Sequence, residues 1–230
     1  MTQKLKVLSA GAVKRGVTRV AAEYARTTGN EVAVEFATAP EVARRISGGE
    51  LVDVIVATPA IMDEFAERGK IIAASRGFVG RSRMGVIIHA DAPAAGLDGV
   101  EAFKRVMLGA SAVVYNSASS GIYAATLMKK LGLAEALASR IIVVPTGSAV
   151  MEYVAAHPPA AVGLGQISEV MVMIEKGCRV KLAGPLPHEI QNITDYSAAA
   201  AAAAPEAARA LAAALTSEAA RKVFAATGID

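Results

Sequence analysis

The chain has 230 residues, of which 53% are hydrophobic, and its 24 Lys and Arg against 21 Asp and Glu leave a net charge of only +3. This balance excludes the basic footprint of a nucleic-acid-binding protein, and aromatic residues, at 4%, offer few platforms for stacking bases. A single cysteine, Cys178, excludes an internal disulfide and a thiolate metal cluster, so we expect a folded protein with a large apolar core.

Neither end of the chain carries a pattern typical of membrane insertion. No apolar run approaches the roughly 20 residues that span a bilayer. The opening residues, MTQKLKVLSAG, form too short and too interrupted an apolar stretch for a signal peptide. As written, the chain is therefore expected in the cytoplasm, or in the periplasm if a leader has been removed.

Short β-rich runs alternate with helical patterns in the first third of the chain. Thr38 and Glu41 open one helix in the positions of a capping box, and Thr58 is expected to act only as the cap of the next. Alternating strands and helices predict a parallel sheet with helices on its faces. The strands are predicted at 4–9, 31–36 and 53–57.

The same alternation restarts after a join near residues 77–83, which predicts two successive α/β units. Near the end, the alanine run 197–204 favours a helix by intrinsic propensity, and helices are predicted after Pro205 and over 217–226. The strands of the second unit are predicted at 84–89, 112–115, 141–144, 161–164 and 179–182.

Motifs for covalent, metal or cofactor chemistry are missing. The serines in YNSASSGIYA at 115–124 do not stand in a nucleophile elbow, and the three histidines do not pair at a zinc-binding spacing. There is no P-loop, and the glycine pattern at 163–168 lacks the third glycine of a dinucleotide site. We therefore expect no metal and no cofactor.

A different local pattern recurs: a strand ends, a small or hydroxyl residue follows, and a helix starts. Helix N-termini offer unpaired N–H groups and partial positive charge, so several of them together make an anion site. The 117–121 stretch holds more polar groups than one cap needs, and its serines are expected to donate to a ligand. The pattern occurs at 9–11, 38–39, 58, 117–121 and 146–148.

Several strings, in this order and spacing, resemble the molybdate-binding branch of the type II periplasmic solute-binding proteins, the substrate-binding components of ABC transporters. The resemblance covers nearly the whole chain. The strings are SAGAV at 9–13, FATAPEVARRI at 36–46, DVIVAT at 53–58, SSGIYAA at 119–125, VGLGQISEV at 162–170, GPLPHEIQ at 184–191 and the closing ARKVFAATGID.

This resemblance implies an α/β fold of two lobes, each a mostly parallel sheet flanked by helices, which close on a ligand in the cleft between them. It implies that lobe I comprises 1–82 plus 195–230 and that lobe II comprises 83–194. Because the chain would return to lobe I from Tyr196, the start of the alanine run is expected to be a strand, against its composition.

The resemblance also implies oxyanion contacts that this sequence lacks. Ala12 and Ala39 stand at the positions that match two serine hydroxyls of molybdate binders, and Gln166 at the position of a tyrosine. An unmatched buried contact typically costs about 1 to 3 kcal/mol. Molybdate and tungstate are therefore less favoured than a small organic di- or tricarboxylate.

The candidate ligand contacts are hydroxyls, amides and backbone N–H groups near helix starts, and one arginine. Arg81 either clamps a carboxylate or lies in solvent, and Arg83 is a weaker candidate. Replacing Ser120 by alanine is predicted to weaken anion binding without unfolding the protein. The predicted set is Ala10, Gly11, Thr38, Ala39, Arg81, Ser117, Ser119, Ser120, Gly121, Thr146, Gly147 and Gln166.

Three functions remain open. A receptor would hand the small anion to a transporter or sensor, and a sensing module would act through a protein partner. The third is a cofactor-independent isomerase of a polycarboxylate, because relatives of molybdate-binding proteins include an aconitate isomerase. Such an enzyme needs a positioned base, for which Glu152 and Glu169 are the nearest carboxylates and neither is assigned.

Overall fold

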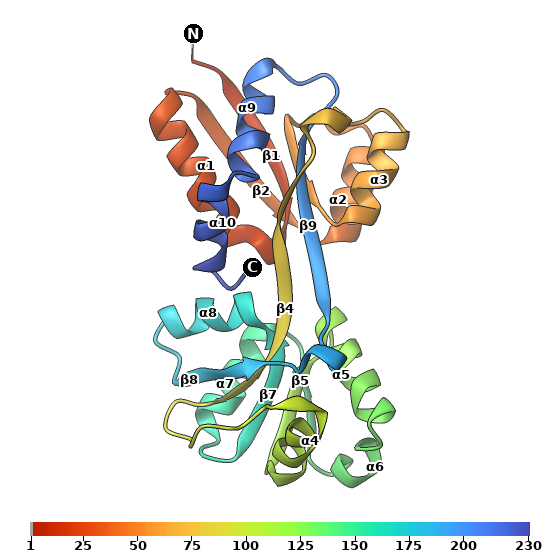
Figure 1. Cartoon of the computed structure of the whole chain (residues 1–230), viewed down its shortest axis with the longest axis vertical. Helices are drawn as coiled ribbons and strands as arrows, with labels where there is room; N and C mark the ends of the chain where they lie inside the picture. The colour runs from red at the N-terminus through yellow and green to blue at the C-terminus, as the bar shows by residue number, and fades with distance from the viewer. Residues whose placement is uncertain (1) are drawn as a thin grey trace. The chain divides into compact units, whose positions relative to one another are not determined.

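The computed structural model describes residues 2–230, which divide into two compact units (Figure 1). Unit 1 comprises the chain up to Ser82 together with Thr194–Asp230, and unit 2 comprises Arg83–Ile193. Two strands, β4 (Gly77–His89) and β9 (Ile193–Ala200), contribute residues to both units.

The sheet of unit 1 has the strand order β2-β1-β3-β9, in which β9 alone is antiparallel to its neighbour. Besides β4 and β9, its elements are β1 (Lys4–Ala10), the 3₁₀-helix η1 (Gly11–Val13), α1 (Lys14–Thr28), β2 (Glu31–Ala37), α2 (Ala39–Ser47), β3 (Val54–Ala57), α3 (Pro59–Glu67), η2 (Ala73–Ser75), α9 (Glu206–Leu215) and α10 (Glu218–Ala225).

Helices cover both faces of this sheet (Figure 1). Val7 packs with α1, α9 and α10 in one apolar cluster, whereas its neighbour Leu8 packs with α2 and α3 in another. Successive residues of a strand point to opposite faces, so a strand buried on both sides needs an unbroken apolar run. This is why β3 reads VIVA without alternation.

The alanine run begins as a strand, as the family resemblance implied. Ala198, Ala199 and Ala200 in β9 are fully buried, and Val54 pairs with Ala200 while Ala57 pairs with Ser197. The helical propensity of alanine is a weak preference that burial between two helical layers overrides. The expectation from composition alone was wrong.

Unit 2 has the strand order β8-β4-β7-β5-β6, with β7, β5 and β6 parallel and β4 antiparallel to both of its neighbours. Besides β4, its elements are α4 (Gly99–Gly109), β5 (Ala112–Asn116), α5 (Ser119–Lys130), α6 (Ala134–Leu137), β6 (Ile141–Val144), α7 (Gly147–Ala156), β7 (Ala161–Gln166), α8 (Ile167–Glu175), β8 (Val180–Pro185) and the 3₁₀-helix η3 (His188–Ile190).

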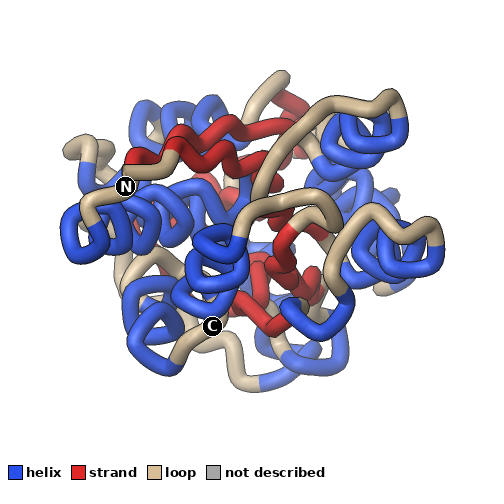
Figure 2. The backbone as a smooth tube through the Cα atoms, turned by 90° about the horizontal axis from the view of Figure 1, so that it is seen from above, coloured by secondary structure: helices blue, strands red, loops and turns tan. Residues whose placement is uncertain are grey.

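This sheet also lies between two helical layers, and Figure 2 shows strands in red beside helices in blue. Phe103 of α4 and Leu127 of α5 pack in the cluster on one face, and Val150 of α7 and Val170 of α8 pack on the other. The α/β class with mostly parallel sheets is thus as expected from the sequence.

The strand at the predicted join is longer than the sequence suggested. The apolar pattern predicted residues 84–89, whereas β4 begins at Gly77 and includes the polar GRSR segment. Ser82 is buried at 1% exposure despite its hydroxyl, so polarity in this segment does not mark a loop. Within residues 2–230, no helix combines the length and the apolar character needed to cross a membrane.

Candidate ligand-binding site

Three helix starts meet at the carboxyl edge of the sheet in unit 1. Ala10 pairs with Ala37, and Ser9 pairs with Val56, so the parallel strands β1, β2 and β3 end side by side. η1, α2 and α3 begin directly after these ends. Because the first N–H groups of a helix have no partner within it, this edge offers N–H donors, although Pro40 and Pro59 contribute none. It includes the predicted Ala10, Gly11, Thr38 and Ala39.

The two threonines at this edge differ in what their hydroxyls do. Thr38 Oγ1 accepts from the Glu41 N–H at 3.4 Å, but the Glu41 carboxylate bonds Arg44 instead of completing the capping box. Thr58 precedes α3 and makes no capping hydrogen bond. Thr58 thus occupies the predicted N-cap position without a capping bond from its side chain, and its half-buried hydroxyl joins the candidate donors.

The carboxyl edge of unit 2 gathers a second set of loops. Asn116 pairs with Val144, and Val114 pairs with Gly163, so the parallel strands β5, β6 and β7 end near one another. Residues 117–121, 145–147 and 166–169 follow these ends and lead into α5, α7 and α8. The predicted Ser117, Ser119, Ser120, Gly121, Thr146, Gly147 and Gln166 all belong to these loops.

Asn116, which the predicted set omitted, organises the first of these loops. Its Oδ1 accepts from the Ala118 N–H at 3.0 Å and the Gly121 N–H at 3.1 Å, and its Nδ2 donates to Ser120 Oγ at 3.1 Å. A Cβ at position 121 would lie 1.5 Å from the Asn116 carbonyl oxygen, so only glycine fits there. A strand-end asparagine four residues before a serine is the sequence signal that could have indicated this turn.

These bonds change the roles of two predicted ligand contacts. Ser120 is 5% exposed, and both its hydroxyl and the Gly121 N–H are engaged by Asn116. They hold the turn instead of facing a ligand. Ser117 and Ser119 are exposed, and their hydroxyls bond no other described residue. The donors left in this loop are those two hydroxyls and the first N–H groups of α5.

Thr146 and Gly147 form the start of α7. Thr146 Oγ1 accepts from the Ala149 N–H at 3.2 Å and lies 3.0 Å from Ser148 Oγ, with both side chains exposed. A Cβ at position 147 would lie 1.8 Å from Glu169 Oε2, so the carboxylate of Glu169 rests directly over the backbone of Gly147.

Glu169 stands in the first turn of α8 and has no ion-pair partner among the described residues. The residue is exposed overall, yet its carboxylate end lies against α7. Burial raises the pKa of the Glu169 carboxyl above its ordinary 4.5. Burial disfavours the charged form of a carboxyl group, which is the cause of this increase in pKa.

The remaining predicted contacts are Arg81 and Gln166. Arg81 Nε bonds Asp195 Oδ1 at 3.0 Å, and its guanidinium lies 5.4 Å from the centre of the Phe78 ring. A ligand carboxylate would therefore have to compete with Asp195 for this arginine. Gln166 ends β7 and is half-buried at the N-cap of α8, where its backbone and side-chain amides lie at the same edge as Glu169.

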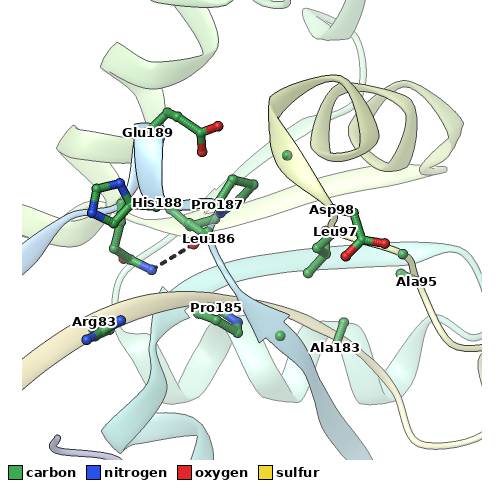
Figure 3. A pocket seen from close by; sticks show the side chains of 14 residues that line it. Arg83, Ala95, Leu97, Asp98, Ala183, Pro185, Leu186, Pro187, His188 and Glu189 are labelled. Atoms are coloured by element: carbon green, nitrogen blue, oxygen red, sulfur yellow. Dashed lines mark hydrogen bonds between the residues drawn. The ribbon is translucent and has the colours of Figure 1, made fainter.

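A groove of about 630 Å³ opens elsewhere in unit 2, between the start of α4 and the segment that follows β8 (Figure 3). Arg83 and His188 lie on one side of it and Asp98 on the other. None of the twelve predicted ligand contacts lines this groove. The lining combines Arg83 and His188 with the carboxylates of Asp98 and Glu189, so the charge of the groove is mixed.

A metal site is likewise not formed by these residues. Within residues 2–230, no three His, Cys, Asp or Glu side chains are placed to hold one ion.

The chain is similar to proteins of known fold and activity. An aconitate isomerase from a Pseudomonas species is 27% identical over 235 residues, covering 98% of this chain and 87% of that protein. A substrate-binding domain assigned to a molybdenum ABC transporter of Clostridium difficile is 17% identical with a TM-score of 0.81, covering 100% of this chain and 99% of that one.

The periplasmic molybdate-binding protein of Azotobacter vinelandii has a TM-score of 0.69 at 18% identity, with 98% of each chain covered. These structural likenesses establish the two-lobed fold of periplasmic binding proteins. The sequence model of one family also matches residues 5–230, which is almost the whole chain. The chain belongs to the bacterial extracellular solute-binding proteins.

Proposed function

We propose that the protein binds a small organic di- or tricarboxylate at the carboxyl edges of its sheets, where helices begin. The observation that carries this proposal is the group of helix starts and hydroxyl side chains at the carboxyl edge of each sheet. Oriented N–H groups at helix starts suit the carboxylate anion, which accepts at two oxygens.

The side chains at these edges support a carboxylate over a metal oxyanion. Ala12 and Ala39 offer no hydroxyl in unit 1, where the candidate donors are N–H groups and the hydroxyls of Thr38 and Thr58. A tetrahedral oxyanion enclosed there would leave several of its oxygens unmatched, at about 1 to 3 kcal/mol each. Molybdate or tungstate remains the less favoured ligand.

A second function is favoured by one specific residue. The carboxyl of Glu169 stands among the donors of unit 2 with a raised pKa, and a relative of similar length is an aconitate isomerase. A carboxylate is out of place in a site that only captures anions, because it repels them. The alternative is therefore a cofactor-independent isomerase of a small polycarboxylate.

The family description as extracellular favours the periplasm over the cytoplasm as the place of action. A receptor there would deliver its ligand to a transporter or to a sensor protein. An isomerase would instead convert an external carboxylate before uptake.

The test is isothermal calorimetry of the purified protein with citrate, both aconitate isomers, malate, sulfate, phosphate and molybdate. Binding of a carboxylate, with molybdate giving no heat, is the expected result.

The double variant Ser117→Ala with Ser119→Ala should weaken binding by about 1 to 3 kcal/mol. Ser111→Ala is the matched control. Ser111 is an exposed serine directly before the start of β5, away from the carboxyl edge, so affinity should stay unchanged. Tight molybdate binding with no carboxylate binding would overturn the proposal.

A further inference from the structure

We infer that Glu169 is the proton-transfer group of this protein, taking a proton from a carbon atom of the bound polycarboxylate and returning it to another. The inference rests on the proposed function, since it requires a carboxylate at the donor-lined edge of unit 2. It adds a reaction to that binding site and assigns the residue that performs it.

The position of Glu169 is the first argument. Its carboxylate lies over Gly147, at the point where α7 begins, and its own helix α8 begins two residues earlier. The loops after β5, β6 and β7 end at this same edge. A ligand bound by the N–H groups and hydroxyls of these loops would therefore lie within reach of the Glu169 oxygens.

The second argument is that the Glu169 carboxylate makes no structural bond among the described residues. No hydrogen bond or ion pair of the Glu169 side chain occurs among the described residues. The elements packed against α8 are α7, β7 and β8, and their ionisable residues are Glu152, Tyr153 and Lys181. Lys181 donates to the Ala92 carbonyl, so it does not neutralise Glu169.

A carboxylate that burial has made more basic is a better proton acceptor than an exposed one at the same pH. The raised pKa of Glu169 has burial as its cause, with no charged neighbour responsible. The carboxylate is thus more basic than an ordinary glutamate, while it remains beside a solvent-exposed edge where a ligand enters.

None of the three histidines lies at this edge. His89 ends β4, which runs antiparallel to β7, so it lies at the opposite edge from Gln166. His157 follows the far end of α7 and stacks on Tyr153 with ring centres 4.0 Å apart. His188 lines the separate groove.

The reaction balances without any other reagent. The Glu169 carboxylate takes H⁺ from a CH₂ group flanked by a carboxylate and a C=C bond, and the C–H electron pair delocalises over the allylic carbons. The protonated Glu169 then gives H⁺ to the far allylic carbon, where a new C–H bond forms and the double bond moves by one position. The N–H groups at the helix starts stabilise the extra negative charge of the intermediate.

Proton NMR in D₂O with cis- or trans-aconitate as the probe tests this inference. The wild-type protein is expected to interconvert the isomers and to place solvent deuterium on the allylic carbons. Glu169→Gln should bind the probe with similar affinity and lose at least about 100-fold in rate. Glu152→Gln, an exposed acid on α7, is the matched control and should keep the wild-type rate.

Gly147→Ala supplies a second variant that leaves the carboxyl in the chain. Its Cβ would occupy the place of Glu169 Oε2, so the rate should fall although Glu169 is still present. Wild-type protein that binds the probe but neither isomerises nor deuterates it overturns the role of Glu169 and leaves the receptor function standing. Full activity in Glu169→Gln also overturns that role, and failure to bind any carboxylate overturns both proposals.

Discussion

Asn116 decides which polar groups of its loop can face a ligand. One amide side chain engages the Ala118 and Gly121 N–H groups and the Ser120 hydroxyl, and the bonds to the last two are buried. A count of serines cannot separate the hydroxyl that holds the turn from those that point to solvent. Ser120 therefore holds the turn, and Ser117 and Ser119 remain predicted ligand contacts.

Asn116→Ala is expected to lower the free energy of unfolding by about 1 to 3 kcal/mol, because it leaves buried donors without an acceptor. Urea denaturation followed by circular dichroism measures the change. Ser119→Ala, at an exposed position of the same loop, should stay within about 0.5 kcal/mol of the wild type. Equal stability of all three proteins would show that the bonds of Asn116 do not hold the turn.

Glu169→Gln is expected to stabilise the ligand-free protein above pH 4.5, the ordinary pKa of a glutamate side chain. The folded pKa is raised, so wild-type stability falls as pH rises from 4.5 through the folded value, and the neutral amide escapes this loss. Thermal unfolding across this pH range should give curves that meet below pH 4.5 and diverge above it. Parallel curves would mean that the carboxyl is not destabilised by burial.

Among the elements, β9 shows how packing limits the size of the side chains at the alanine end of a strand. Ala199 is fully buried in the cluster that contains α2 and α3. Ala199→Val raises strand propensity but adds volume to a filled layer, which typically costs about 1 to 3 kcal/mol. Ala203→Val in the exposed turn after β9 is the control and should change stability by less than about 0.5 kcal/mol. A stabilised Ala199→Val protein would show that space remains beside the strand.

Sequence patterns predicted most elements because their apolar runs are short, regular and separated by capping residues. They failed where a tertiary layer overrides local chemistry, as at Ala198 in β9 and at the polar start of β4. They placed Thr58 correctly at an N-cap but did not show that its hydroxyl makes no capping hydrogen bond. The loops of the site were predictable from strand ends, whereas the pairing of Asn116 and the place of Glu169 depend on contacts between loops.

For the whole molecule, the central question is whether both units contribute to binding one ligand. Thr58→Val in unit 1 and Ser119→Ala in unit 2 each remove one candidate donor hydroxyl. If the ligand contacts both, calorimetry should show about 1 kcal/mol lost for each variant and roughly the sum for the double variant. Loss confined to one variant would place the ligand on one unit alone.

The contact between Glu169 and Gly147 turns two separate positions into a single marker for reading related genes. Because the resting carboxylate fills the space that a Cβ at position 147 would need, a larger residue there displaces the acid from its place. Chains that keep both are expected to catalyse, and chains with a larger residue at 147 only to capture and deliver. A survey of such pairs could thus divide transport receptors from enzymes before any of them is purified.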